Sequence, residues 1–315
     1  MRRAAFRYPC LRPSASSTLA ALLTLWSACA WAQGMDLFPL PGTEGTGERE
    51  LKALASAYPD RIVAAVVHDG DWALQVDGQW YSWTHGRILP QAQRVDWERY
   101  SRFRFYPYPL GGLPPLPRLD AESAARLKKL LEESRIRPPR RSEAFLERLL
   151  GGGSKRETLG RIMTVDFLGF PVEVHERIAG ALRDVASECD ALCRSDPQVS
   201  GFFGGLSEVD GFNYRDVAGT LTRSYHSYGL ALDLIPKSYD GKVPYWRWAM
   251  EKNEQWWTTS YERRWMVPDA VVAAFERHGF VWGGKWLFFD TMHFEYRPEI
   301  LILARQRGPR EAPLL

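Results

Sequence analysis

The 315-residue sequence predicts an α+β fold built around antiparallel sheets. Three β-rich runs at 61–67, 72–76 and 79–83 are separated by Asp-Gly turns, which are typical of hairpins. Apolar residues recur at helical spacing over 174–193, which predicts a long helix. Residues 292–296 alternate as a strand does. We therefore expect a small N-terminal α+β region followed by a larger α+β domain with a central antiparallel sheet and flanking helices.

Residues 1–32 are typical of a secretory leader. Four arginines precede a short apolar core at 19–26, and Ala30-Trp31-Ala32 forms an Ala-x-Ala cleavage site. The core is shorter than the roughly 20 residues of a membrane-spanning helix. We expect cleavage after Ala32, a periplasmic or secreted mature protein, and no stable membrane span. The alternative is a lipoprotein anchored at Cys29, which Trp26 disfavours because such signals usually carry leucine there.

The charge of the mature chain argues against a nucleic-acid partner. The leader holds four arginines and no acidic residue, so its removal leaves 37 of the 41 basic residues against 38 acidic ones, a net charge of −1. Nucleic-acid binding relies on a basic surface. The chain is instead rich in aromatic residues, with 13 Trp, 13 Tyr and 15 Phe, which suit deep cores and equally suit grooves for sugars or peptides.

Cys189 and Cys193 are the cysteines that remain after leader removal. An exported pair favours a disulfide, and a spacing of four on a helix places the Cα atoms about 6 Å apart, within disulfide range. The alternative is two buried thiols, and the sequence leaves both open.

The N-terminal half continues beyond the β-rich runs. A linker at 33–47 and a helix-like segment at 48–58 precede those runs. Residues 95–110 interleave arginines with aromatic residues, which we interpret as a packed strand or short helix; the alternative is a stacking surface for glycan or nucleic acid. An amphipathic helix is predicted at 121–134 and another short helix at 142–150.

Gly151-Gly152-Gly153 is typical of a flexible joint, so we place a domain boundary there. Residues 33–150 form an N-terminal region of unknown role, and 151–315 form the second domain. That domain begins with a strand at 162–167 and contains a helix at 268–278 that closes at Gly279. Between them, 236–268 holds five tryptophans that either wall a groove or fill the core of an insertion.

A carboxylate stands inside a short apolar run. Asp233 lies within 230–235, after a turn at Gly229. If this run is a buried strand, an ionised Asp233 costs several kcal/mol unless a cation meets it, and the run contains no Lys or Arg. A metal ion held by Asp233, His226 and His293 would supply the cation and form a three-ligand site with an open position, as in catalytic zinc.

Two separated motifs contain these residues. The first has the pattern Ser-x-His-x-x-Gly-x-Ala-x-Asp, and the second has Trp, Asp-x-x-His and Phe-Glu; the residues are Ser224, His226, Gly229, Ala231, Asp233, Trp286, Asp290, His293, Phe294 and Glu295. In this pattern the chain resembles the zinc D-alanyl-D-alanine carboxypeptidases and L-alanyl-D-glutamate endopeptidases, which include VanY-like and phage-endolysin-like peptidoglycan peptidases. The resemblance covers about 165–315.

The resemblance implies a hedgehog/DD-peptidase-like domain at 151–315 that holds one Zn²⁺ per chain through His226, Asp233 and His293. Asp290 corresponds to the general base of the endopeptidase branch. Arg215 is the best match to an arginine that holds substrate and stabilises the oxyanion, with Arg223 as a rival and a loop ion pair as the alternative role. Ser224 and Trp286 are further substrate-binding candidates.

Alternation over 292–296 places Glu295 on the same face as His293, where it can orient this ligand. The implied activity is hydrolysis of the peptidoglycan stem peptide by zinc-activated water, without a covalent enzyme intermediate. The Asp290-x-x-His293 form leans towards the endopeptidase, but the choice between it and D-Ala-D-Ala carboxypeptidase stays open. The alternative is a catalytically inactive zinc-containing module for wall binding or signalling, which an intact Asp290 argues against.

Overall fold

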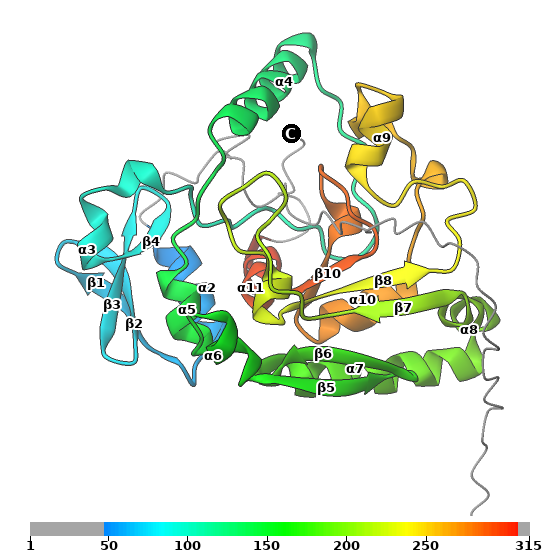
Figure 1. The fold of residues 1–315 in the computed structure, drawn as a ribbon, viewed down its shortest axis with the longest axis horizontal. Helices are drawn as coiled ribbons and strands as arrows, with labels where there is room; N and C mark the ends of the chain where they lie inside the picture. Colours follow the sequence, from blue (N-terminus) through cyan, green and yellow to red (C-terminus); the bar gives the residue numbers. More distant parts are fainter. Residues whose placement is uncertain (1–46, 308–315) are drawn as a thin grey trace, which may run out of the picture.

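The computed structural model describes residues 47–307 (Figure 1). The predicted leader, its cleavage site, Cys29 and the linker at 33–46 lie outside the described residues. Among the described helices, none combines the length and the apolar character that crossing a membrane requires. The described residues form an α+β fold with antiparallel sheets and helices, which confirms the coarse fold class.

The central sheet is four-stranded and antiparallel, in the order β7-β8-β10-β9 (Figure 1). Its strands are β7 Leu206–Asp210, β8 Ala231–Pro236, β9 Phe280–Trp282 and β10 His293–Tyr296. Register places His293 opposite Asp233 across the pair β8 and β10. The buried apolar run predicted around Asp233 is thus a strand with neighbours on both sides, because β7 pairs with its other edge.

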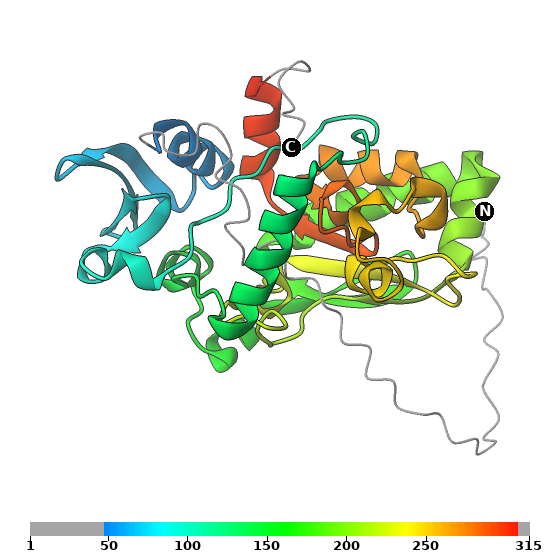
Figure 2. The same cartoon turned by 90° about the horizontal axis from the view of Figure 1, so that it is seen from above.

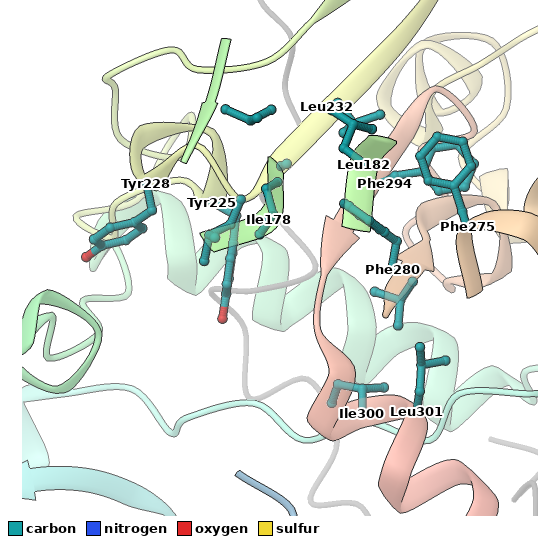
Figure 3. Packing of buried hydrophobic residues seen from close by; sticks show 14 of the residues in the cluster. Ile178, Leu182, Tyr225, Tyr228, Leu232, Phe275, Phe280, Phe294, Ile300 and Leu301 are labelled. Carbon is teal, nitrogen blue, oxygen red and sulfur yellow. The ribbon is translucent and has the colours of Figure 1, made fainter. Parts of the chain in front are cut away.

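The helix α10 Asp269–Arg277 packs against β9 of this sheet, and α7 Glu176–Ser195 packs against α10. Their core includes Ile178 and Leu182 of α7, Phe275 of α10 and Phe294 of β10 (Figure 3). The rings of Phe275 and Phe294 stack with their centroids 4.0 Å apart. The apolar spacing that predicted a helix over 174–193 is therefore the face that α7 buries.

Further elements surround this core. The hairpin of β5 Ile162–Phe167 and β6 Phe170–His175 packs on α7, which α8 Pro197–Gly204 follows. The C-terminal helix α11 Pro298–Arg307 packs on α2 Glu48–Ala57 of the N-terminal region.

Cys189 and Cys193 are both free thiols in the structure, so the disulfide alternative is not realised. Both lie in α7. Positions i and i+4 of a helix separate Cβ atoms by about 5–6 Å, whereas a disulfide needs about 3.8 Å. Burial raises the pKa of Cys189 to about 12, so this thiol stays protonated and packs as a small apolar side chain.

The N-terminal region contains the predicted antiparallel meander, at the opposite end of the molecule from α8 (Figure 2). Its strands are β1 Ile62–His68, β2 Asp71–Val76, β3 Gln79–Thr84 and β4 Arg87–Pro90. Asp69-Gly70 and Asp77-Gly78 have positive φ at both residues, as tight hairpin turns require. The strand β4 and the short helix α3 Gln91–Arg94 follow, which the sequence did not predict. The short helix η1 Trp97–Arg99 lies within 95–110, where a strand or short helix was expected.

Residues 100–111, here called the strap, contain no helix or strand and are hydrogen-bonded to residues of the second half of the chain. Tyr108 donates its hydroxyl to Glu276 at 2.5 Å and accepts from the backbone nitrogen of Trp282 at 2.9 Å. Lys285 donates to the carbonyls of Pro109 and Gly111. The aromatic strap is thus packed, as the plainer interpretation of 95–110 held, and its backbone is bonded to the domain it crosses.

The helices α4 Ala121–Ile136, α5 Ala144–Leu150 and α6 Lys155–Leu159 complete the first half. One buried cluster includes Leu54 of α2, Phe145 of α5 and Phe275 of α10. This cluster therefore continues across the domain boundary that the sequence predicts near 150. The division into two domains at that point stays a prediction.

A second apolar cluster joins α4 to the insertion at 236–268, which contains α9 Trp246–Lys252, η3 Trp256–Thr258 and η4 Tyr261–Arg263. Leu127 and Leu131 of α4 pack with Trp246, Trp256 and Trp257. These three tryptophans fill a core, which is one of the two alternatives, whereas Trp248 and Trp265 are half-buried.

Replacing Tyr108 with Phe removes one hydroxyl that satisfies two buried partners. We expect a loss of about 1–3 kcal/mol in the free energy of unfolding, because the amide of Trp282 keeps no acceptor. Urea denaturation of both proteins measures the difference. Tyr261→Phe is the control, because its half-buried hydroxyl makes one bond, to the carbonyl of Pro114, and its loss costs about 0.5–1.5 kcal/mol. Equal losses in the two variants would contradict this role for Tyr108.

Candidate metal centre

Three side chains, two from neighbouring strands of the central sheet and one from a short helix, lie next to one another. Asp233 lies in β8 and His293 in β10, while His226 lies in the 3-10 helix η2 Tyr225–Tyr228. The oxygen Oδ1 of Asp233 lies 2.8 Å from His293 Nδ1 and 3.4 Å from His226 Nε2, and these two nitrogens are 3.2 Å apart. The structure thus brings together all three residues that the sequence singled out as a metal site.

Local backbone features fix His226. The side chain of Ser224 caps η2 by accepting from the backbone nitrogen of His226 at 3.3 Å. Gly229 ends the helix with φ of +66°, a conformation that favours glycine. A Cβ at Gly229 would lie 2.6 Å from the backbone nitrogen of His175. The motif spacing Ser-x-His-x-x-Gly therefore has a folding role in this chain, and Ser224 acts as a cap.

The outer nitrogens of both imidazoles are bonded, which leaves the inner nitrogens directed at Asp233. His226 Nδ1 lies 2.6 Å from the carbonyl oxygen of Gly211, so it is the donor of that pair. His293 Nε2 lies 3.1 Å from Glu295 Oε1, and Glu295 shares its face of β10. When Nδ1 of His226 and Nε2 of His293 carry the protons, the other nitrogen of each ring presents a lone pair to the shared space.

The cluster favours positive charge. Burial by itself would raise the pKa of Asp233, but the imidazoles of His226 and His293 hold it well below its usual range. Burial lowers the pKa of His293, but hydrogen bonds to Asp233 and Glu295 outweigh it and raise that pKa to about 10. Among the described residues, Oδ2 of Asp233 is buried without a hydrogen-bond partner. A cation at this position would compensate both the carboxylate charge and the unbonded oxygen.

Asp290 lies at the bend before β10 and is 3% exposed. Its Oδ1 accepts from the backbone nitrogen of Met292 at 3.3 Å, and its own backbone nitrogen donates to Gly283. An isolated bridge with Tyr245 ties the same bend to the insertion. These hydrogen bonds to Met292 and Gly283, together with the bridge to Tyr245, fix the position of Asp290 three residues before His293.

The two arginine candidates have different surroundings. Arg223 donates to Glu147 of α5 at 2.8 Å and to the carbonyl of Gly153. Its guanidinium therefore binds α5 and the loop that follows this helix. Arg215 is half-buried, and Ser227 holds its backbone through both the nitrogen and the carbonyl. Burial raises the pKa of Asp210 in β7, and the charges of His226 and Arg215 oppose this rise.

Two aromatic residues border the cluster. Trp286 is half-buried, and its ring lies 5.7 Å from that of His293. Tyr239 donates its hydroxyl to the sulfur of Met292 at 3.0 Å. Burial and the charges of Asp290 and Asp233 raise the pKa of Tyr239 to about 12. The sequence predicted a role for Trp286 but missed Tyr239, because Tyr239 lies in the insertion without a motif that marks it.

Residues 218–296 match a family model described as D-alanyl-D-alanine carboxypeptidase. This match supports a peptidase. It spans His226, Asp233, Asp290 and His293, whereas Arg215 lies just before it. Residues 50–105 match the model of a domain of unknown function, which corresponds to α2, the meander and the start of the strap. No solved structure matched the chain.

Gly229→Ala is expected to lower the free energy of unfolding by at least about 2 kcal/mol, because it combines a strained φ with overlap against the backbone of His175. Chemical denaturation of the purified variant measures this loss. The control is Gly180→Ala in α7, where an added Cβ meets open space and is expected to stabilise by about 0.5–1 kcal/mol. A Gly229→Ala protein of unchanged stability would contradict the cap assignment.

Proposed function

We propose that the protein is an exported zinc metallopeptidase that hydrolyses peptide bonds of the peptidoglycan stem. The observation that carries the proposal is the convergence of His226 Nε2, His293 Nδ1 and Asp233 Oδ1 within 3.4 Å of one another. Zinc bonds to imidazole nitrogen and carboxylate oxygen are about 2.0–2.2 Å long, so tetrahedral geometry separates neighbouring ligand atoms by about 3.3–3.6 Å. The two distances from His226 Nε2 are close to these values.

The donor set also fits zinc chemically. Two neutral imidazoles and one carboxylate supply three ligands, and a catalytic zinc site keeps its fourth position open. The bonds to Gly211 and Glu295 orient both rings as second contacts of metal-binding histidines commonly do. When bound, zinc would polarise a carbonyl and lower the pKa of a coordinated water to about 7.

The remaining chemistry falls to side chains of this chain. Asp290 would accept a proton from the attacking water and pass it to the leaving amine as the peptide bond breaks. The guanidinium of Arg215 would face the carbonyl oxygen, where negative charge builds in the transition state. Trp286 and Tyr239 would wall the space beside His293. Tyr239 keeps its proton at neutral pH and can donate a hydrogen bond there.

The substrate class follows from the family match and from the predicted leader. The matched model is described by a D-alanyl-D-alanine bond, which occurs in the peptidoglycan stem. An exported peptidase would meet that substrate outside the cytoplasm. The Asp290-x-x-His293 spacing favours cleavage within the stem, so we assign the endopeptidase reaction as the first to assay and removal of terminal D-alanine as the second.

Metal content is the first test. We expect about one zinc per chain in the purified mature protein by elemental analysis, and less than a tenth of that in His293→Ala, which lacks one of three ligands. Wild-type protein that binds no zinc would contradict the assignment of the centre.

Asp290→Ala is expected to reduce the rate of stem-peptide cleavage by about 10²–10⁴-fold, because the general base is lost. The same variant should keep zinc near one per chain, since Asp290 is not among the three ligands. Mass spectrometry of released fragments, with and without chelator, measures the rate and names the bond. The control is Asp184→Ala, an exposed position on α7, which should retain both zinc and rate. Zinc without any product from wild type would instead favour the binding module.

A further inference from the structure

A chain of buried charged groups leads away from His293. Glu295 accepts from His293 Nε2 through Oε1, and its other oxygen lies 3.7 Å from Arg297 Nη1. The Nε of Arg297 donates to Glu299 Oε1. Its Nη2 donates to the backbone carbonyl of Arg104 in the strap at 2.7 Å. One guanidinium therefore contacts two carboxylates and the strap at the same time.

These groups lie in the interior of the protein. Glu295, Arg297 and Glu299 are each 2% exposed or less. Aromatic rings surround the guanidinium, which lies 5.0 Å from the ring centroid of Tyr225 and 5.8 Å from those of Phe103 and Tyr106. A buried set of ions stabilises a fold less than apolar packing of equal volume often does. Its presence directly behind a metal-centre residue indicates a role beyond stability.

The contacts define that role. Glu295 can hold the ring of His293 only as firmly as its own carboxylate is held. Arg297 Nη1 forms an ion pair with the oxygen of Glu295 that His293 does not use, at 3.7 Å and therefore beyond hydrogen-bond distance. Arg297 is in turn fixed by Glu299 on one side and by the strap carbonyl on the other. Tyr225, which flanks the guanidinium, immediately precedes His226 in η2, so the network touches the supports of both imidazoles.

We propose that Arg297 is a positioning residue of the metal centre, which acts through Glu295 on His293, and that the strap completes this support through the carbonyl of Arg104. The inference rests on the proposed function in one respect, that the three-residue cluster binds zinc. It gives residues 100–111 a function, because they supply a backbone acceptor and two rings to the network behind a metal ligand.

Arg297→Lys in the full mature chain tests the proposal. Lysine keeps the positive charge but has no planar fork, so it cannot contact Glu295, Glu299 and Arg104 together. We expect zinc affinity, measured by competition with a chromophoric chelator, to fall about 10-fold or more. The visible absorption bands of the cobalt-substituted protein should also shift, because the ring of His293 changes its orientation at the metal.

The matched control is Arg61→Lys. Arg61 is a half-buried arginine that also donates to one carboxylate, that of Asp77, and to backbone carbonyls, those of Leu149 and Arg148, away from the strap. Its replacement should lower thermal stability while zinc affinity and the cobalt spectrum stay as in wild type. If Arg297→Lys behaves in the same way, Arg297 has a structural role alone and the proposal is overturned.

Action through Glu295 is tested by a double-mutant cycle. Glu295→Gln should weaken zinc binding to a similar degree, and the double variant should be little weaker than Glu295→Gln alone. Fully additive losses would overturn the proposed route. If Arg297→Lys does not fold, Glu299→Gln loosens the same guanidinium and should weaken zinc binding several-fold, whereas unchanged affinity would overturn the proposal.

The outcomes separate this inference from the proposed function. Wild-type protein that binds no zinc overturns the proposed function and this inference with it. Zinc-binding wild type with unchanged affinity in Arg297→Lys overturns the inference alone. Affinity is read without substrate, so failure to detect hydrolysis bears only on the proposed peptidase activity.

Discussion

The burial of Asp233 is the constraint on which the rest of the structure depends. This carboxylate is 1% exposed in the middle of an apolar strand, where an uncompensated charge would cost several kcal/mol. Compensation comes from two imidazoles, and each of them is itself buried and bonded on its outer nitrogen. Each polar group of the site is thus hydrogen-bonded to the next one. The two imidazole nitrogens and the carboxylate oxygen that face one another are a donor set suited to a cation.

The sheet and one short helix build this arrangement with few parts. Antiparallel register sets His293 opposite Asp233, so a shift by one residue would turn one of them to the other face. The helix η2 brings His226 to the same place, and its two ends are fixed by the Ser224 cap and by the left-handed Gly229. Three ligand candidates thus owe their positions to backbone hydrogen bonds, which are stiffer than side-chain packing alone.

Support for the centre extends well beyond the segment that matches the peptidase family. The strap bonds to Lys285 and Glu276 through its backbone and Tyr108, and to Arg297 through Arg104. α4 packs on the tryptophans of the insertion between the two metal motifs. Some of the aromatic residues serve these contacts, since the ring of Tyr106 lies against that of Trp286 and the ammonium of Lys285 lies over the ring of Tyr108.

The sequence by itself determined the α+β class, the meander, the helix α7 and the three residues that meet in the candidate metal centre. These follow from local causes: Asp-Gly turns, apolar periodicity, and a carboxylate that an apolar strand cannot bury without a partner. The sequence left the roles of Arg215 and Arg223 open. The structure separates the two arginines, because Arg223 forms an ion pair with Glu147, a contact between residues far apart in the chain.

The cysteine pair, the packing of 100–150 and the network around Arg297 were decided by tertiary structure. Cysteine spacing left both alternatives open, and the structure shows two free thiols on α7. Nothing local in the strap predicts that a carbonyl at Arg104 faces a guanidinium almost two hundred residues later in the chain. Such contacts depend on which surfaces the fold brings together, and periodicity and turn chemistry carry no information about that choice.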